Sequence, residues 1–215
     1  MSYSKPLIYD RIIGDSLSPA LKLIASRIEP GSRVLDVGCA SGYFGQYLVE
    51  TRHCSVTGVD YSADAVEVAR RRGLDAYPID LEREPLDSRE FDVVVFADVL
   101  EHVRNPADVL AAVQAHRILV SLPNIGHWSA RMELVRGHFP LEDFGLFDRT
   151  HVRFFTRTTA RDLIQGAGFR IVSEQTNPLL PFEGHRVPGL RRAREPLTRL
   201  APELLALQFV FDAVR

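Results

Sequence analysis

The chain has 215 residues, of which 46% are hydrophobic, and a formal net charge of −2 at pH 7. This length can bury one substantial core, so we expect a single domain over residues 1–215. The near-neutral charge argues against a nucleic-acid partner. We expect no membrane association, because the sequence has neither an apolar run of about 18 residues nor the apolar core of a signal peptide. A cytoplasmic location follows by default.

The first predicted element is a helix over residues 16–28, which has apolar residues at helical spacing and ends before Pro30-Gly31. With the residues ahead of it, it forms a leader at 1–30. Tyr3, Tyr9 and Arg11 lie in that leader, which either folds over a ligand or forms a mobile tail.

The sequence RVLDVGCASGYF at residues 33–44 predicts a short buried strand, a glycine-containing turn and a following helix over 43–50. Gly38 and Gly42 allow a sharp bend and a close approach of a ligand to the backbone. The turn lacks the full G-x-G-x-x-G spacing, so a tight turn without a ligand remains an open alternative.

A second short strand over residues 55–59 ends on Asp60 and Tyr61. In doubly wound α/β folds, a carboxylate at this distance past the glycine turn accepts hydrogen bonds from ribose hydroxyls. The turn and Asp60 together therefore indicate a cofactor that contains adenosine. Dehydrogenases and methyltransferases both fit this pattern.

The alternation of strands and helices continues and predicts a parallel, doubly wound sheet. Ser62 is a plausible N-cap of the next helix. The predicted elements are a helix at 63–72, a strand at 76–79, a strand at 91–96, a helix at 106–115 and a strand at 117–122. Asp80 and Leu81 follow the third strand, although Asp80 equally fits a capped turn. Ala97 and Asp98 follow the fourth strand, where a ligand pocket is expected, and His102 comes one helical turn later.

The character of the chain changes at about residues 125–156, which we expect to form a lid-like insertion. This segment concentrates aromatic, histidine and arginine residues, among them His127, Trp128, Arg131, Arg149 and His151. Aromatic side chains exclude water, and His and Arg side chains orient a polar acceptor, so we expect the segment to face a substrate. The alternative is a lid with packed aromatic residues and solvated arginines.

The remainder predicts a helix over 156–166, a sixth strand over 169–174, an irregular region over 176–202 with a short helix near 190–200, and a last strand over 208–214. The two cysteines, Cys39 and Cys54, have no metal-ligand spacing, so we expect reduced thiols and no metal site.

Three ordered stretches, LDVGCASGYFG, GVDYSADAVEVAR and FDVVVFADVLEHVRNP, resemble the first, second and fourth motifs of class I S-adenosylmethionine-dependent methyltransferases. LVSLPNIGHWSARMELVRGHFP resembles the MetW-like branch, and LFDRTHVRFFTRTTARDLIQGAGFRI resembles a segment of small methyltransferases that act on sugars and natural products. The resemblance covers residues 34–172 and departs at Ala40, where many relatives have glycine. It implies a Rossmann-like, doubly wound, seven-stranded sheet with helices on both faces, mostly parallel with an antiparallel last strand beside the fifth.

The resemblance also implies S-adenosylmethionine as the cofactor. Amides of the glycine turn would hold its amino-acid end, Tyr61 would stack on adenine, and Asp80 would accept from the adenine amino group. The expected cofactor-binding residues are Asp36, Gly38, Ala40, Gly42, Tyr43, Phe44, Asp60, Tyr61, Asp80, Leu81, Ala97 and Asp98.

A hydroxyl acceptor must lose its proton during methyl transfer, and histidine is suited to accept it. His102 is the first candidate base and His151 the second; His127, Trp128, Arg131 and Arg149 are the expected substrate residues. The leading hypothesis is a small-molecule methyltransferase that acts on a hydroxyl of a sugar or secondary metabolite, either alone or as a homodimer. A MetW-like partner of a biosynthetic enzyme is the alternative, and a nicotinamide dehydrogenase is disfavoured by the turn spacing.

Overall fold

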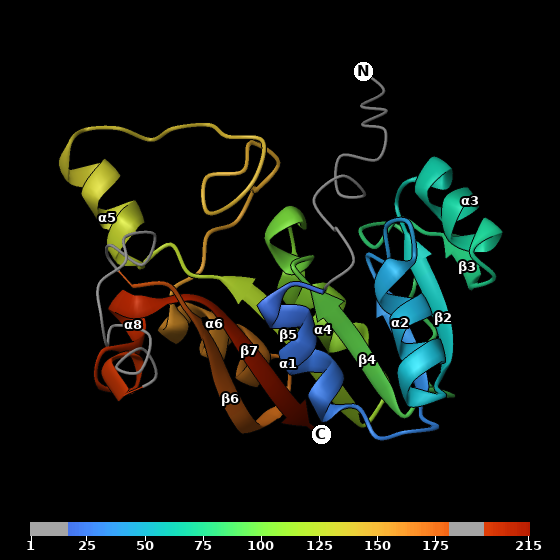
Figure 1. The fold of residues 1–215 in the computed structure, drawn as a ribbon. Coiled ribbons are helices and arrows are strands. Elements are labelled where there is room, and N and C mark those ends of the chain that lie inside the picture. Colours follow the sequence, from blue (N-terminus) through green and yellow to red (C-terminus); the bar gives the residue numbers. More distant parts are fainter. Residues whose placement is uncertain (1–16, 181–195) are drawn as a thin grey trace.

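A computed structural model describes residues 17–180 and 196–215 (Figure 1). Tyr3, Tyr9, Arg11 and most of the helix predicted near 190–200 lie outside these ranges. Within them, no helix is long and apolar enough to cross a bilayer.

The fold is built on one seven-stranded sheet with the order β3-β2-β1-β4-β5-β7-β6. The strands are β1 (Arg33–Val37), β2 (Ser55–Asp60), β3 (Asp75–Pro78), β4 (Val93–Ala97), β5 (Arg117–Pro123), β6 (Arg170–Pro178) and β7 (Ala206–Val214). The pairs formed among β1 to β5 are parallel, and β7 is antiparallel to both β5 and β6. The predicted fold class, including a last strand beside the fifth, is confirmed.

Helices cover both faces of this sheet. The helices of the described residues are α1 (Pro19–Arg27), α2 (Tyr43–Arg52), α3 (Ala63–Arg71), the 3₁₀ helix η2 (Leu100–His102), α4 (Pro106–Ala112), α5 (Trp128–Val135), α6 (Arg157–Gly166) and α8 (Pro202–Leu205). One core cluster joins the sheet to α1, α2 and α3, and a second joins it to η2, α4 and α6. The apolar strands of the centre are buried from both sides, as parallel strands require.

Local sequence explains where several helices begin. The Ser18 hydroxyl accepts from the Leu21 amide at the start of α1, and Ser62 accepts from the Ala65 amide at the start of α3. Each side chain satisfies an amide that the first helical turn leaves without a partner. The N-cap predicted at Ser62 is therefore confirmed.

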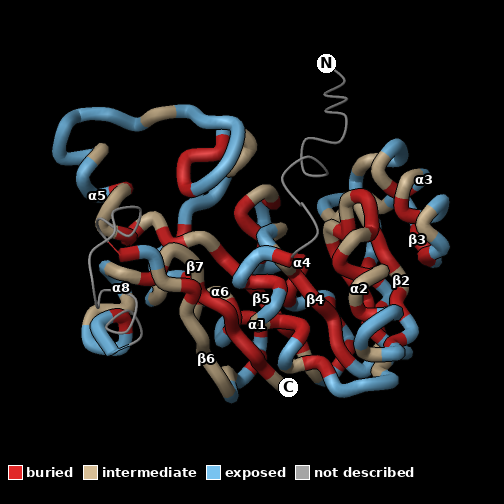
Figure 2. Tube along the Cα trace, viewed as in Figure 1, coloured by how far each residue is buried: buried red, intermediate tan, exposed pale blue. Residues whose placement is uncertain are grey.

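Two regions differ from the sequence-based prediction. The lid segment contains the helix α5, which was not predicted, and the region expected to be irregular begins with the end of β6, which extends to Pro178. The polar end of β6 carries no apolar alternation, and its conformation is set by pairing with β7. Figure 2 shows the contrast in burial between the central strands and the exposed loop that follows α5.

Candidate active site

The glycine turn between β1 and α2 is held against its neighbours by its own backbone. Gly38 has φ +72°, and a Cβ at this position would lie 2.4 Å from Cγ2 of Val99. The Gly38 and Cys39 amides both donate to the Val59 carbonyl, over 2.7 Å and 3.0 Å. Gly38 is thus required by both conformation and space.

Asp60 ties this turn to the end of β2. Its carboxylate accepts from the Ala40 amide and from the Ser62 amide, each at 2.8 Å. Ala40 has φ +47°, in the left-handed region that favours glycine. The amides of Gly38, Cys39 and Ala40 therefore all donate to acceptors within the protein.

Asp36 lies beneath the turn and is almost completely buried. Its Oδ2 has no hydrogen-bond partner among the residues that the structure describes. Burial first, and the nearby Asp60 second, raise the pKa of the Asp36 carboxyl from 3.8 to about 7. Burial, together with Asp36 and Asp60, also raises the pKa of the Cys39 thiol. The two neighbouring carboxyls, Asp36 and Asp60, therefore favour a positively charged ligand at this end of the sheet.

The other residues expected at the cofactor differ in what they face. Tyr61 is 79% exposed and open to stacking, whereas Phe44 is buried in the core and Tyr43 packs partly against it. Gly42 has φ +79° and lies so close to Ala69 that a Cβ would come within 2.8 Å of the Ala69 Cβ. Gly42 therefore serves the packing of α2 against α3.

Asp80 and Leu81 follow β3. An Asp80 carboxylate oxygen accepts from the Glu82 amide, and the other lies 3.3 Å from Arg83 Nε. This is the capped turn that the sequence left as an alternative. Leu81 is partly buried and lines a cavity of about 130 Å³ beside α4.

Asp98, directly after Ala97 at the end of β4, has φ +56° and is held by two other strands. It accepts a hydrogen bond from Ser121 Oγ over 2.7 Å, and its two carboxylate oxygens accept from Gln208 Nε2 over 2.9 Å each. Ser121 belongs to β5 and Gln208 to β7, so three strands fix this carboxylate at the edge where the crevice is expected.

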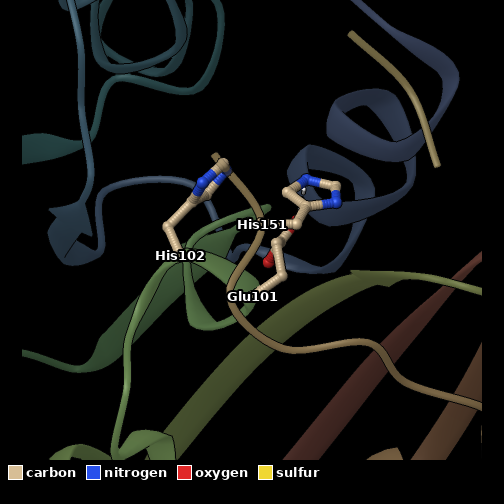
Figure 3. Close-up of side chains that lie close together, drawn as sticks. All are labelled: Glu101, His102 and His151. Carbon is tan, nitrogen blue, oxygen red and sulfur yellow. Dashed lines mark ion pairs between the residues drawn. The ribbon is translucent and has the colours of Figure 1, made fainter. Parts of the chain in front are cut away.

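The two candidate bases lie close together (Figure 3). The centroids of the His102 and His151 rings are 4.8 Å apart. His102 Nδ1 lies 3.2 Å from the Thr150 carbonyl and 3.1 Å from the Thr150 hydroxyl. That hydroxyl donates to Asp148 over 2.6 Å, so the Nδ1 of His102 carries the proton and donates to Thr150. The lone pair of a neutral His102 then resides on Nε2.

Glu101 completes this cluster and is only 1% exposed. Neither carboxyl oxygen has a hydrogen-bond partner among the described residues, and one lies 3.9 Å from His151 Nε2. Burial, followed by Asp98 and Asp148, raises the pKa of the Glu101 carboxyl well above 4.5. Burial, followed by His102, lowers the pKa of His151. Near pH 7 this cluster therefore favours the neutral forms of both groups.

Phe154 of the lid segment contacts His151 and belongs to a chain of aromatic contacts. The rings of Phe139 and Phe154 are 5.4 Å apart, Phe154 lies 6.1 Å from the His151 ring, and Phe139 also contacts Phe147. These rings reduce the access of water to His151.

The four residues expected to contact substrate, His127, Trp128, Arg131 and Arg149, each make a contact within the protein. His127 is fully buried and caps α5, and both its Nε2 and the Trp128 Nε1 lie 2.9 Å from the Leu179 carbonyl oxygen. Burial lowers the pKa of His127, which favours a neutral ring. Arg131 donates to the Gly126 carbonyl and Arg149 pairs with Asp143 at 3.0 Å. None of these four contacts is made to His102 or His151.

Four residues of the candidate site were not singled out from the sequence: Glu101, Ser121, Thr150 and Gln208. A polar Ser121 within an apolar strand and a Glu101 beside a candidate base were available signals. Thr150 and Gln208 reach the site only through the tertiary fold.

Comparisons with known proteins assign this chain to a family. Residues 18–177 match the family described as MetW, methionine biosynthesis protein MetW. A ubiquinone biosynthesis O-methyltransferase of Hahella chejuensis is 38% identical over 90 residues, which are 39% of this chain and 37% of the relative. A probable tRNA methyltransferase 9B of Homo sapiens is 28% identical over 126 residues, 58% of this chain and 27% of the relative. The chain thus spans about a third of the length of these relatives.

Solved structures match over more of the chain. An S-adenosylmethionine-dependent methyltransferase from Mesorhizobium loti has a TM-score of 0.62 and 20% identity, covering 92% of this chain and 96% of that one. A complex between the Haloferax volcanii Trm112 methyltransferase activator and a methyltransferase gives a TM-score of 0.62 at 16% identity, covering 91% of this chain and 88% of that one. At these identities the likeness concerns the fold.

Proposed function

Because the chain belongs to the MetW family, within the class I S-adenosylmethionine-dependent methyltransferase superfamily, we propose that it transfers a methyl group from S-adenosylmethionine to a hydroxyl of a small molecule, such as a sugar or secondary metabolite. The cofactor would lie over the carboxyl ends of β1, β2 and β4. The reaction would take place in the cytoplasm, a reducing compartment that suits the two buried free cysteines.

The pair of carboxyls Asp36 and Asp60 supports the cofactor. S-adenosylmethionine carries a sulfonium and an ammonium group, and Asp36, beside Asp60, has a buried carboxyl oxygen without a partner in residues 17–180 and 196–215. A positive charge at this point would offset the repulsion between the two carboxyls. Asp60 keeps further lone pairs for ribose hydroxyls, Tyr61 is exposed for stacking, and the ends of the strands supply the remaining contacts.

The fixed orientation of the His102 ring is the observation that best supports a hydroxyl group as the methyl acceptor. Its Nδ1 donates to Thr150, whose hydroxyl donates to Asp148, so Nε2 is presented as the proton acceptor. This is the arrangement of a base oriented by a second group. In-line methyl transfer requires alignment and exclusion of water, and the ring cluster of Phe139 and Phe154 supplies the second of these.

The test combines binding and turnover. Isothermal titration with S-adenosylhomocysteine should show micromolar or tighter binding, and NAD should not bind. Methyl transfer to a panel of hydroxyl acceptors should fall about 100-fold or more in His102→Ala, and should persist in His116→Ala, a control on an exposed histidine. Binding of NAD alone would overturn the proposal, and full activity of His102→Ala would overturn the assignment of the base.

A second candidate function, a partner of a biosynthetic enzyme, is favoured by the apolar surface of the lid. Leu134, Val135 and Leu141 are 48%, 81% and 66% exposed. Such side chains commonly mark protein contacts. Absence of transfer across a broad panel, together with a stable complex with a methionine-biosynthesis enzyme in size-exclusion chromatography with light scattering, would favour this candidate.

A further inference from the structure

The buried carboxyl of Glu101 is the polar group that the proposed reaction leaves unused. A carboxyl in this position costs several kcal/mol when its oxygens lack partners, and both Glu101 oxygens lack one among the described residues. His151 Nδ1 is also buried without a hydrogen bond within the same part of the chain. One carboxylate and two imidazoles thus converge on one point with capacity for a further ligand (Figure 3).

Backbone hydrogen bonds fix the two segments that carry these side chains. The Glu101 carbonyl accepts from the Val152 amide at 2.9 Å and from the Arg153 amide at 3.0 Å, and His102 reaches back to the Thr150 carbonyl. The 3₁₀ helix η2 and the loop after α5 are therefore joined on both sides of the cluster. The convergence is built by the backbone and does not depend on a chance contact of side chains.

We propose that Glu101, His102 and His151 bind one divalent transition-metal cation of the zinc or iron(II) type. Two histidines and one carboxylate form a ligand set that suits these ions and leaves coordination positions open. Each of the three residues offers one ligand atom, and these atoms lie within 4.8 Å of one another. Metal bonds of about 2.1 Å require ligand separations of about 3 to 3.5 Å, so the ligand atoms move by roughly an ångström to close on the ion.

The surroundings of His102 match those of a metal ligand. A ligating histidine almost always donates its second ring N–H to a carbonyl or carboxylate, which fixes the ring and its tautomer. His102 Nδ1 donates to Thr150, and Thr150 in turn donates to the buried Asp148. The Nε2 lone pair is thus directed away from Thr150 and available to the ion. A cation at this position would contradict the sequence-based expectation, drawn from the spacing of the two cysteines, that the chain has no metal site.

A bound cation would change how an acceptor hydroxyl is activated. This step rests on the proposed function, whereas the binding of the cation does not. A hydroxyl that enters an open coordination position becomes more acidic because the cation stabilises the alkoxide, and its proton passes to a water molecule of the solvent. His102 then acts as a ligand rather than as the base, and loss of His102 removes both roles.

The test is a titration of the full chain, treated with a chelator and then dialysed, with zinc chloride in a calorimeter. We expect one ion per chain with a dissociation constant of micromolar or below. Co²⁺ in place of Zn²⁺ should give visible absorption bands of a site with nitrogen ligands. Glu101→Gln and His151→Gln should each weaken binding about 100-fold or more.

His138→Gln is the matched control. His138 also lies near a carboxylate, with Nδ1 3.4 Å from Glu133, but its side chain is 67% exposed. This variant should bind zinc as the native chain does. Glu101→Gln should in addition keep or raise the melting temperature of the metal-free protein, because it removes a buried ionisable group, and should abolish the rise caused by zinc.

No stoichiometric binding, or equal affinity in the native chain, Glu101→Gln and His151→Gln, would overturn the metal site. If one of the two variants does not fold, the other decides. Titration of S-adenosylhomocysteine into the same samples separates the two proposals. Cofactor binding without zinc binding counts against the metal site alone, and zinc binding without cofactor binding counts against the proposed function alone.

Discussion

The glycine turn and the lid segment with the adjoining η2 are two regions of the candidate site. They differ in whether their polar groups find hydrogen-bond partners within the protein. In the turn, the consecutive amides of Gly38, Cys39 and Ala40 donate to acceptors at the end of β2. Around the lid, Glu101 and His151 are buried with atoms that have no hydrogen bond among the described residues, and several apolar side chains are exposed. The amides of the turn thus have partners within the protein. The lid region, in contrast, contains buried polar atoms without such partners and apolar side chains exposed to solvent. We expect a ligand to bind where buried polar groups lack hydrogen-bond partners within the protein.

Asp36, on β1 just before the turn, is the exception in this region, and its replacement gives the largest expected effect. The folded state raises the pKa of this carboxyl from 3.8 to about 7, so it binds more protons than the unfolded state between those values. Stability therefore falls as pH rises from about 4 to about 7, by up to about 4 kcal/mol for this group. Asp36→Asn should be more stable than the native chain at pH 8 and should bind S-adenosylmethionine less tightly.

Urea unfolding at pH 5, 7 and 8, with and without the cofactor, measures both effects. An unchanged slope of stability against pH in Asp36→Asn would assign the slope to other groups and break the contrast between Asp36 and the rest of the turn.

Gly38→Ala tests whether the turn is as tightly packed as its geometry indicates. A methyl group would meet Val99 at 2.4 Å and would force an alanine into φ +72°, so we expect a loss of about 3 kcal/mol in unfolding free energy and a loss of cofactor binding. Gly73→Ala is the control, because Gly73 has φ +86° but a Cβ added there would meet nothing within 4 Å. It should cost about 1 kcal/mol.

Equal losses in these two glycine variants would show that backbone conformation alone, and not contact with Val99, makes Gly38 necessary. Urea titration and calorimetry with S-adenosylhomocysteine provide the two measurements.

Thr150→Val tests the lid. The valine removes the hydroxyl that links Asp148 to His102 but keeps the volume. We expect kcat to fall about tenfold, which is about 1.4 kcal/mol, because His102 is less firmly oriented as base or as ligand. KM should change little, and Thr150→Ser should retain the native kcat. A normal kcat in Thr150→Val would show that the backbone carbonyl of Thr150 is sufficient.

Ala40→Gly gives the smallest expected effect. Ala40 has φ +47°, and glycine at this position should stabilise the chain by about 1 kcal/mol without loss of cofactor binding. Thermal and urea unfolding measure the change. A destabilised Ala40→Gly would mean that the turn tolerates alanine without strain.

The same contrast explains what could be predicted from the sequence. The turn is made of neighbours in the chain, so the strand before Gly38 and the carboxylate of Asp60 could be predicted from local pattern. The order of the sheet followed from the resemblance. The lid depends on distant residues: nothing near His127 indicates that it caps α5 and contacts the Leu179 carbonyl. The burial of Glu101 likewise follows from segments separated by about fifty residues.

The position of β7 between β5 and β6 has a consequence for synthesis on the ribosome. The residues of β6 are translated before those of β7, so β6 has no neighbour to join until Ala206–Val214 has emerged. Gln208, which holds the Asp98 carboxylate, arrives at the same moment. A nascent chain can thus assemble the parallel half early, but it fixes the Asp98 carboxylate only after the residues of β7 have emerged.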